Sequence, residues 1–166
     1  LIYNIKERFF MITLVTFGID PYSLRQLSRE ITPGLTALFE CKEDDINFYA
    51  TEGLFVHNGV EQNTWYVVIK VMLPRKLQIF QKEAAHIINN FYKNVAIHLE
   101  IIFEYYLSDE REIFINKDYP LYLNENNLVE TTDSSELAQK KQEEIEQTAK
   151  KVKELYRKGK YDRMYM

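Results

Sequence analysis

The order of hydrophobic and polar residues predicts that the chain begins, after about ten residues, with a strand followed by a helix. Residues 12–17 are all apolar or β-branched, and the Gly-Ile-Asp-Pro sequence that follows ends the strand and starts a helix with Asp20 as N-cap and Pro21 in its first turn. Apolar side chains then recur at helical spacing, at Leu24, Leu27, Ile31, Leu35 and Leu38. Pro33 interrupts this stripe, so we expect a kink or a break near Thr32.

The next hundred residues repeat this pattern with a hairpin inserted. Residues 46–51 predict a second strand, and Asn58-Gly59 predicts a tight hairpin turn because both residues tolerate positive φ. Residues 65–73 are nearly all apolar, which is typical of a strand in the middle of a sheet. Pro74 ends this strand and opens a second helix, and residues 97–106 alternate as a last strand. The apolar stripe of the second helix comprises Leu77, Phe80, Ala84, Ile87, Ile88 and Phe91.

This order predicts an α+β fold in which two tandem β-α-β units share one sheet. Because each crossover is right-handed, both helices are expected on one face of that sheet. The other face carries Tyr66, Val68 and Met72 of the central strand, and we expect it to be too apolar to stay in contact with water. A closed ring of identical copies would cover it, so the sequence predicts a homo-oligomer.

The last part of the chain has a different character, and the predicted organisation has four parts. Residues 1–10 form a leader or upstream extension, residues 11–121 the β-α-β domain, residues 122–132 a linker and residues 133–166 a charged C-terminal helix. Asp133 and Glu136 form a capping-box-like start for this helix. Its apolar stripe is narrow, which is typical of a helix that lies on a surface, pairs with another helix or binds a protein partner. A solvated, fraying helix is the alternative.

Composition and charge exclude several classes of function. The 166 residues carry 21 Lys and Arg against 25 Asp and Glu, a net charge of −4, which disfavours nucleic acid as a partner. No apolar run reaches the roughly 18 residues of a membrane span, and the single cysteine, Cys41, fits a cytoplasmic location. Glycine-rich phosphate loops and clustered histidines or cysteines do not occur, so we expect neither a cofactor nor a metal.

Two segments carry a family resemblance. The sequences DDINFYATEGLFVHNGVEQ and LPRKLQIFQKEAAHII, with Arg75, Gln78 and Gln81 at the start of the second helix, resemble an uncharacterised bacterial domain-of-unknown-function family of the tautomerase superfamily, which includes macrophage migration inhibitory factor. The resemblance implies a tautomerase-like fold, a homotrimer and sites between subunits. Enzymes of that superfamily use an N-terminal proline as general base, so the resemblance implies that a catalytic member would carry a proline at the start of its first strand.

The residue after Met11 departs from that chemistry, because it is Ile12. If residues 1–10 precede it, its nitrogen is an amide that takes up no proton. If translation starts at Met11 rather than at Leu1, the free amine is primary, with a reference pKa of about 7.7 to 8.0. The sequence therefore predicts a protein of unknown function that has a tautomerase-like fold and is non-catalytic or divergent.

The alternative is a tautomerase or isomerase that acts on a small carbonyl acid in a cleft between subunits. His98 and Glu100 alternate onto one face of the last strand and are the candidate proton-transfer pair. Lys70 and Arg75 are the candidate groups for holding a substrate carboxylate. These four residues follow from residue type and strand position, and a half-exposed strand with no catalytic role shows the same alternation.

Overall fold

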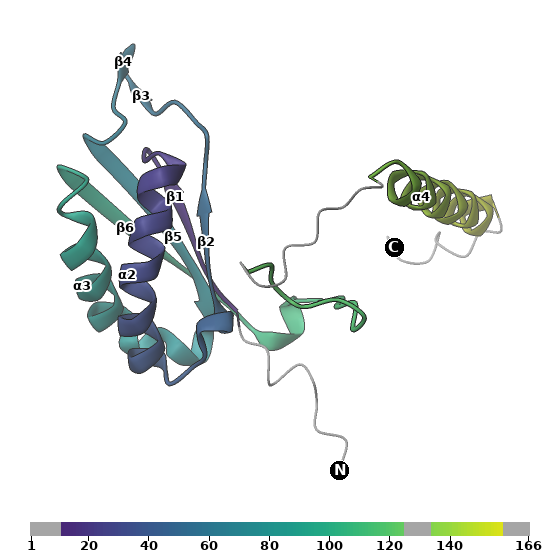
Figure 1. The fold of residues 1–166 in the computed structure, drawn as a ribbon, viewed down its shortest axis with the longest axis horizontal. Helices are drawn as coiled ribbons and strands as arrows, with labels where there is room; N and C mark the ends of the chain where they lie inside the picture. Colours follow the sequence, from purple (N-terminus) through teal and green to yellow (C-terminus); the bar gives the residue numbers. More distant parts are fainter. Residues whose placement is uncertain (1–10, 125–133, 158–166) are drawn as a thin grey trace. The chain divides into compact units, whose positions relative to one another are not determined.

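A computed structural model describes residues 11–124 and 134–157 of the chain (Figure 1). The chain divides into two compact units, residues 1–116 and residues 117–166. The elements of the first unit are β1 (Ile12–Phe17), α2 (Pro21–Phe39), β2 (Ile46–Ala50), β3 (Val56–His57), β4 (Val60–Glu61), β5 (Tyr66–Pro74), α3 (Gln81–Tyr92) and β6 (His98–Tyr106). Three short 3₁₀ helices cover Glu43–Asp45, Arg75–Phe80 and Ser108–Glu110. The second unit contains α4 (Ser134–Arg157), and none of the described helices is long and apolar enough to cross a membrane.

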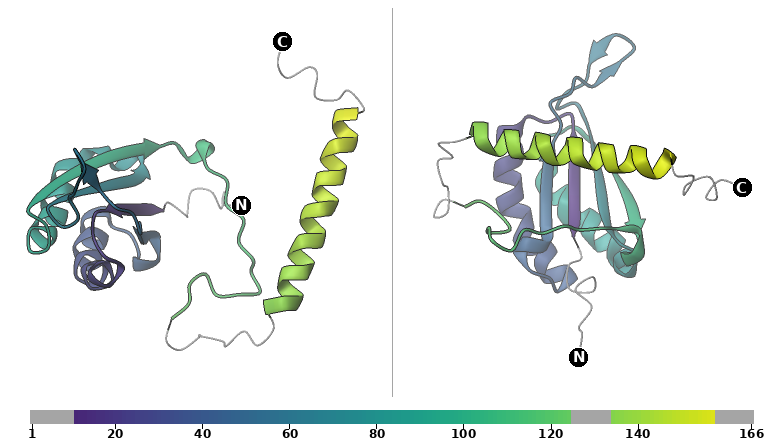
Figure 2. Two further views of the ribbon diagram at one scale, coloured as in Figure 1. Left: turned by 90° about the horizontal axis from the view of Figure 1, so that it is seen from above. Right: turned by 90° about the vertical axis from the view of Figure 1, so that its right-hand side faces the viewer.

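The first unit is built on a four-stranded mixed sheet with the strand order β2-β1-β5-β6. β1 is parallel to β2 and β5 is parallel to β6, while the two central strands, β1 and β5, run antiparallel. Each parallel pair is connected by one helix, and Figures 1 and 2 show α2 and α3 side by side on the same face. The α+β fold with two tandem β-α-β units is therefore confirmed.

The core lies between this face and the two helices. Alternate residues of the two central strands, such as Leu14 and Ile69, are completely buried there, as are Ile31 of α2 and Ile88 of α3. The buried side chains of this core are Ile12, Leu14, Ile19, Leu24, Leu27, Ile31, Leu35, Phe39, Ile46, Val67, Ile69, Val71, Leu73, Leu77, Ala84, Ile88, Tyr92 and Ala96. The alternation means that every second residue of the same strands faces away from the core.

One polar pair is enclosed in the core. The hydroxyl groups of Tyr92 and Thr16 form a hydrogen bond of 2.9 Å, which satisfies both groups where water does not reach. Burial raises the pKa of Tyr92 to about 12, although the hydrogen bond with Thr16 acts in the opposite direction. Tyr92 therefore stays neutral at every physiological pH. It is also the last buried residue of α3, one position beyond Phe91, where the apolar stripe predicted from the sequence ends.

Helix α2 begins as expected and continues without a break through the position where a kink or a break was predicted. The carboxylate of Asp20 accepts a hydrogen bond from the Ser23 amide at 2.8 Å, so Asp20 is the N-cap. Of the kink or break predicted near Thr32, the break is wrong, because one helix runs from Pro21 to Phe39 with Pro33 inside it. Core residues on both sides of Pro33 are buried, and this packing outweighs the lost backbone hydrogen bond.

The glycine next to this proline allows the two helices to pack closely. A Cβ atom added to Gly34 would lie 3.2 Å from the side chain of Ile87 in α3. That distance is tighter than most contacts of a real Cβ, so a larger residue would push α3 away. The Pro33-Gly34 dipeptide therefore belongs to the helix–helix contact, not to a helix end.

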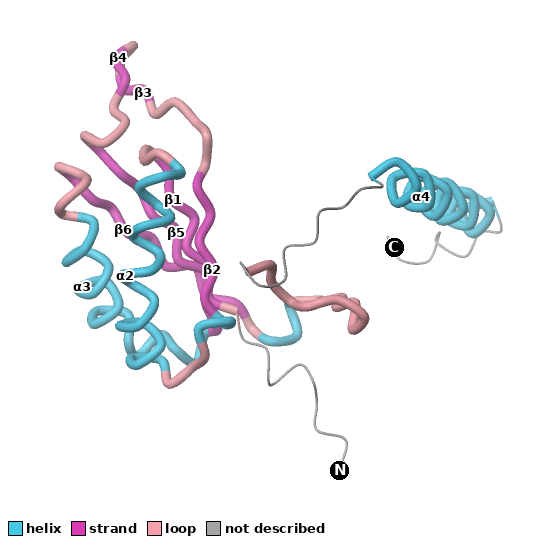
Figure 3. The backbone as a smooth tube through the Cα atoms, viewed as in Figure 1, coloured by secondary structure: helices cyan, strands magenta, loops and turns pink. Residues whose placement is uncertain are grey.

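The hairpin is formed by β3 and β4, and its turn is the predicted Asn58-Gly59, with φ values of 48° and 81°. These two strands make a separate ribbon at one end of the main sheet (Figure 3). The second predicted helix differs in its start, since residues 75–80 are 3₁₀ and the α-helix begins at Gln81. In the second unit, the predicted cap Asp133 and the chain after Arg157 lie outside the described residues.

Candidate functional site: the open face of the sheet

The candidate site lies on the face of the sheet that α2 and α3 leave open. The side chains of β5 and β6 that do not face the core are those of Tyr66, Val68, Lys70, Met72, His98, Glu100, Ile102, Glu104 and Tyr106, all of them partly or fully exposed. Three of the four residues predicted from the sequence, Lys70, His98 and Glu100, are among them. The open face therefore carries both apolar and ionisable groups.

Two polar links run diagonally between these strands. Tyr66 is paired with His98 in the sheet, but its hydroxyl donates to the carboxylate of Glu100 at 2.8 Å. In the same way Lys70 is paired with Ile102, and its ammonium lies 3.1 Å from the carboxylate of Glu104. Such pairs contribute about 0 to 1 kcal/mol each when solvent reaches them, so they orient side chains more than they stabilise the fold.

The predicted proton-transfer pair is close along one strand but engaged with other partners. The ring of His98 lies edge-on to Trp65 at 5.8 Å and tilted against Tyr66 at 6.2 Å. The hydrogen bond to Glu100 is the main reason why the pKa of Tyr66 is raised, so the phenol keeps its proton and remains the donor. No hydrogen bond in the described part of the chain joins His98 to Glu100.

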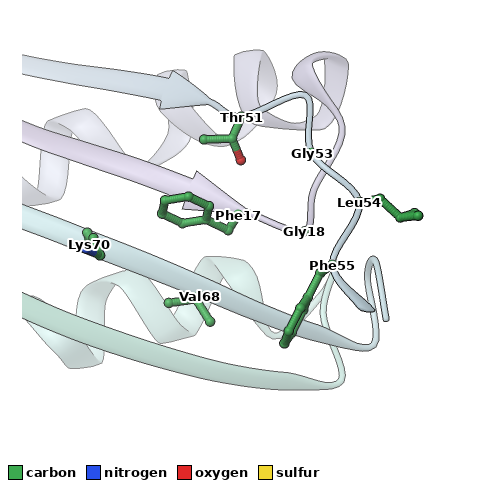
Figure 4. Close-up of a pocket in the computed structure, with 8 residues that line it drawn as sticks. All are labelled: Phe17, Gly18, Thr51, Gly53, Leu54, Phe55, Val68 and Lys70. Carbon is green, nitrogen blue, oxygen red and sulfur yellow. The ribbon is translucent and has the colours of Figure 1, made fainter. Parts of the chain in front are cut away.

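A pocket of about 350 Å³ lies beside these residues, between the end of β1, the loop before β3, and β5 (Figure 4). Its lining consists of Phe17, Gly18, Thr51, Gly53, Leu54, Phe55, Val68 and Lys70. Phe17 and Val68 are paired across β1 and β5, and Lys70 follows on the same face of β5. Lys70 is thus the one ionisable residue in an otherwise uncharged lining.

The loop that borders the pocket is held at several points. The side chain of Asn63 accepts a hydrogen bond from the amide of Phe55 at 3.0 Å and donates one to the carbonyl of Gly53 at 3.4 Å. At the start of the loop, the Thr51 hydroxyl donates to the carbonyl of Thr16 at 2.9 Å. The Phe55 ring packs edge-on against Tyr66 at 5.7 Å. The pocket wall is therefore fixed by the hairpin and by the sheet.

Arg75, the fourth predicted residue, lies elsewhere. It follows the last residue of β5, whereas His98 is paired with the first residue of that strand. At about 3.3 Å per residue, the two positions are about 30 Å apart along the strand. The structure brings Lys70 and Glu100 to neighbouring positions on one face and separates Arg75 from both.

A second polar cluster lies at the start of β1 and was not predicted from the sequence. The hydroxyl of Tyr106 accepts from the amide of Met11 at 3.0 Å and donates to the carbonyl of the same residue at 2.6 Å. Arg111 donates to that hydroxyl at 2.6 Å, and its guanidinium lies 5.2 Å from the centre of the Tyr106 ring. The other terminal nitrogen of Arg111, Nη2, is buried without a hydrogen-bond partner among the described residues.

This cluster occupies the end of β1 at which the superfamily resemblance places an N-terminal base. The nitrogen of Met11 is an amide, since Phe10 precedes it in the chain, and it is already hydrogen-bonded. Ile12 is completely buried in the core. With residues 1–10 preceding them, both nitrogens are backbone amides.

The missed residues differ in how well the sequence marks them. Tyr106 continues the alternation of the last strand, so counting in steps of two from His98 would have placed it on the open face. Phe17 ends the first strand in the same manner. Arg111 follows an irregular segment, and no periodic signal marks it.

The sheet order, the two crossover helices and the open face define an α+β protein of tautomerase-like fold. No family profile and no curated protein matches the chain. Among solved structures, a domain of unknown function, DUF1904, from Sebaldella termitidis is 18% identical with a TM-score of 0.57, and the match covers 62% of this chain and 95% of that one. A protein of unknown function from Vibrio cholerae is 15% identical with a TM-score of 0.55, covering 68% and 89% of the two chains.

A macrophage migration inhibitory factor-like protein from Entamoeba histolytica also matches, at 9% identity and a TM-score of 0.49, over 63% of this chain and 95% of that one. At these identities the similarity is one of fold. The resemblance predicted from the sequence, to a bacterial domain-of-unknown-function family, is confirmed at the level of fold by the Sebaldella termitidis structure.

Proposed function

We propose that this chain is a divergent, bacterial cytoplasmic protein of tautomerase-like fold that binds a small carboxylate with an apolar body in the open-face pocket and does not use an N-terminal proline. The position of Lys70 carries the proposal, since it places a single cation at an uncharged pocket. A volume of about 350 Å³ lies in the range of about 300 to 1,000 Å³ typical of small-molecule sites. No metal or cofactor is required for such binding.

The ion pair of Lys70 with Glu104 is compatible with this role. Both side chains are more than two-fifths exposed, at 43% and 45%, so the pair is weak in water. An ammonium group has three donors and can hold Glu104 and a ligand carboxylate at the same time. The carboxylate would lie at the Lys70 end of the pocket, and the apolar body against Phe17 and Val68.

The oligomer is part of the same proposal. The open face exposes apolar side chains of two strands, and a closed ring of copies, most simply a homotrimer, would cover it. The pocket would then lie at or near a contact between subunits. Water would be partly excluded from it, and the attraction between Lys70 and a carboxylate would be stronger than at a bare surface.

A second candidate function is tautomerisation or isomerisation of a small carbonyl acid. It is supported by the register of the sheet, because Glu100 is paired with Val68, which lines the pocket. In this case Glu100 or His98 would move a proton while Lys70 holds the substrate carboxylate. Arg75 has no part in it from within the same subunit, and would act only if another copy brought it to the pocket.

Calorimetric titration with phenylpyruvate, and with the neutral analogue phenylacetone, tests the binding proposal. We expect the Lys70→Met variant to bind phenylpyruvate about tenfold more weakly, which corresponds to about 1.4 kcal/mol. Lys82→Met is the matched control, since Lys82 is an exposed residue of α3 on the other side of the sheet. Equal affinity of the wild type for the acid and the neutral analogue would contradict the proposal.

A keto–enol assay with phenylpyruvate separates the two candidate functions. If the protein only binds the acid, the rate equals that of buffer, whereas the enzyme candidate requires a higher rate that falls in Glu100→Gln or His98→Gln. A rate above buffer that neither substitution lowers would contradict the roles assigned to both residues.

A further inference from the structure

The open-face pocket has a charged end and an aromatic end. Figure 4 shows Lys70 at one end, then Phe17 and Val68, and the ring of Phe55 beyond them. The Phe55 ring packs edge-on against Tyr66, four residues before Lys70 on β5, with 5.7 Å between the ring centroids. Four residues of a strand span about 13 Å, so the position of Phe55 sets how long an apolar body the pocket accepts.

Phe55 is held mainly by one side chain outside the pocket. It lies in residues 51–55, which are neither helix nor strand, so no sheet ladder fixes this end of the pocket. The side-chain oxygen of Asn63 accepts a hydrogen bond from the Phe55 amide at 3.0 Å, and its nitrogen donates a longer, weaker one to the carbonyl of Gly53 at 3.4 Å. A main-chain hydrogen bond from the amide of Gln62 to the Phe55 carbonyl, at 2.7 Å, completes the attachment.

The backbone next to Asn63 is held in a strained conformation. Thr64 has a φ of 67°, in the left-handed region that β-branched residues rarely adopt and that persists only where surrounding contacts enforce it. Its amide donates to the carbonyl of Gly18 at 2.8 Å, and its carbonyl accepts from the amide of Ile97 at 3.2 Å. Gly18 lines the pocket and has no room for a side chain, since an added Cβ would lie 2.9 Å from the carbonyl oxygen of Tyr66. These contacts fix the direction in which the Asn63 side chain leaves the main chain.

We propose that Asn63 is a positioning residue that, through the amide of Phe55, fixes the aromatic end of the pocket and so determines its preference for a long apolar body over a short one. The inference rests on the proposed function, because it concerns the same pocket and a carboxylate held by Lys70. Asn63 is not among the residues that line the pocket. Its effect is therefore on the fit of the apolar body, and a ligand too short to reach Phe55 does not sense it.

Calorimetric titration with phenylpyruvate and with pyruvate, two keto acids that differ by the ring, tests this proposal. Asn63→Leu keeps the size of the side chain and removes both of its hydrogen bonds. We expect the affinity for phenylpyruvate to fall about five- to tenfold and that for pyruvate to change less than about twofold, because Lys70 is untouched. An equal fall for both acids, or no fall for phenylpyruvate, would overturn the proposal.

Two further variants distinguish positioning from a general loosening of the hairpin. Gln62→Met is the matched control, because it removes a side-chain hydrogen bond of the same hairpin, the 3.1 Å bond to the carbonyl of Val60, and leaves the main-chain bond to Phe55 in place. The ratio of the two affinities should stay at its wild-type value in this variant. A fall of the ratio in Gln62→Met equal to that in Asn63→Leu would overturn the proposal.

Asn63→Asp tests the hydrogen bond itself. A carboxylate still accepts from the Phe55 amide, so this variant should keep the preference for phenylpyruvate that Asn63→Leu loses. The added negative charge acts on both acids and cancels in the ratio of their affinities. A ratio in Asn63→Asp as low as that in Asn63→Leu would mean that the hydrogen bond to Phe55 does not set the preference.

Hydrogen exchange separates a failure of this inference from a failure of the proposed function. Without any ligand, the Phe55 amide should exchange about tenfold faster in Asn63→Leu than in the wild type. If the wild type binds neither acid, the proposed function and this inference both fail. If the wild type prefers phenylpyruvate but exchange of the Phe55 amide is the same in Asn63→Leu, this inference alone fails.

Discussion

The two faces of the central sheet come from the same strands but differ in chemistry. On β5 the residues that face the helices are Val67, Ile69, Val71 and Leu73, all aliphatic and buried, whereas the intervening Lys70 carries a charge and borders a pocket. The covered face gains its stability from close packing, which tolerates little change. The open face keeps groups that can bind, because no neighbouring helix requires their space. Side chains alternate between the two faces, so every second residue of one strand stabilises the core and the residues between them are available for binding.

The difference between the faces predicts unequal effects for the same substitution on one strand. Val71 is 1% exposed on the covered face, and Val71→Ala should lower the free energy of unfolding by about 2 to 3 kcal/mol through lost burial and a cavity. Val68→Ala on the open face should cost less than about 1 kcal/mol in the isolated subunit. Urea unfolding followed by fluorescence measures both.

The same experiment tests whether the open face is covered in solution. If copies of the chain bury Val68, its substitution becomes more costly as the protein concentration is raised, whereas the cost of Val71→Ala stays the same. Equal costs for the two substitutions at every concentration would contradict the distinction between the faces.

The buried tyrosine of the covered face predicts a loss of stability at high pH. The pKa of Tyr92 is raised to about 12 in the folded protein, against about 10 in the unfolded chain. Between these values the unfolded state loses a proton that the folded state keeps, so stability falls as the pH rises, by about 2.7 kcal/mol in total. Unfolding measured from pH 9 to 12 should show a steeper fall in the wild type than in Tyr92→Phe. Parallel curves would show that this phenol titrates normally.

The polar cluster of Met11, Tyr106 and Arg111 at the start of β1 predicts a smaller effect on stability. Tyr106→Phe removes the hydroxyl that bridges Met11 and Arg111 and leaves a second nitrogen of the guanidinium without its partner. We expect a loss of about 1 to 2 kcal/mol, together with faster hydrogen exchange of the Met11 amide. Tyr105→Phe is the control, because that hydroxyl is bonded to Gln81 at the surface. Unchanged hydrogen exchange at Met11 in Tyr106→Phe would show that the hydrogen bonds of this polar cluster are not formed in solution.

Much of this fold follows from local sequence signals. Three signals each predict one local structure, and the structure confirms all three. They are the helix start at Asp20-Pro21, the hairpin turn at Asn58-Gly59 and the strand predicted from the alternation along residues 97–106. Pro33 does not break its helix, because the effect of proline on the backbone is local, while the burial of residues on both sides of it is a property of the packed molecule. Tyr92 was missed because its hydroxyl group kept it out of the predicted stripe, which counted only residues without a polar group.

The candidate site follows from the sequence only in part. The alternation along the last strand puts His98 and Glu100 on one face, as in the structure, and counting in steps of two from Tyr66 and Val68 gives the open face for Lys70. The pocket depends on the antiparallel pairing of β1 with β5, which brings Phe17 beside Val68, and residues 51 apart in the chain carry no local signal of such a contact. Arg111 is defined by its contact with Tyr106, so only three-dimensional coordinates show its role.

The smallest predicted effect concerns the ion pair on the open face. Glu104→Gln removes the partner of Lys70, and since both side chains are exposed the free energy of unfolding should change by less than about 0.5 kcal/mol. The affinity for a ligand carboxylate should rise, because the ammonium of Lys70 is then free for that carboxylate and a nearby negative charge is gone. Titration with phenylpyruvate should show an affinity about two- to fivefold higher than that of the wild type. A lower affinity would mean that Glu104 holds Lys70 in position for the ligand carboxylate and does not compete with that carboxylate for the ammonium group.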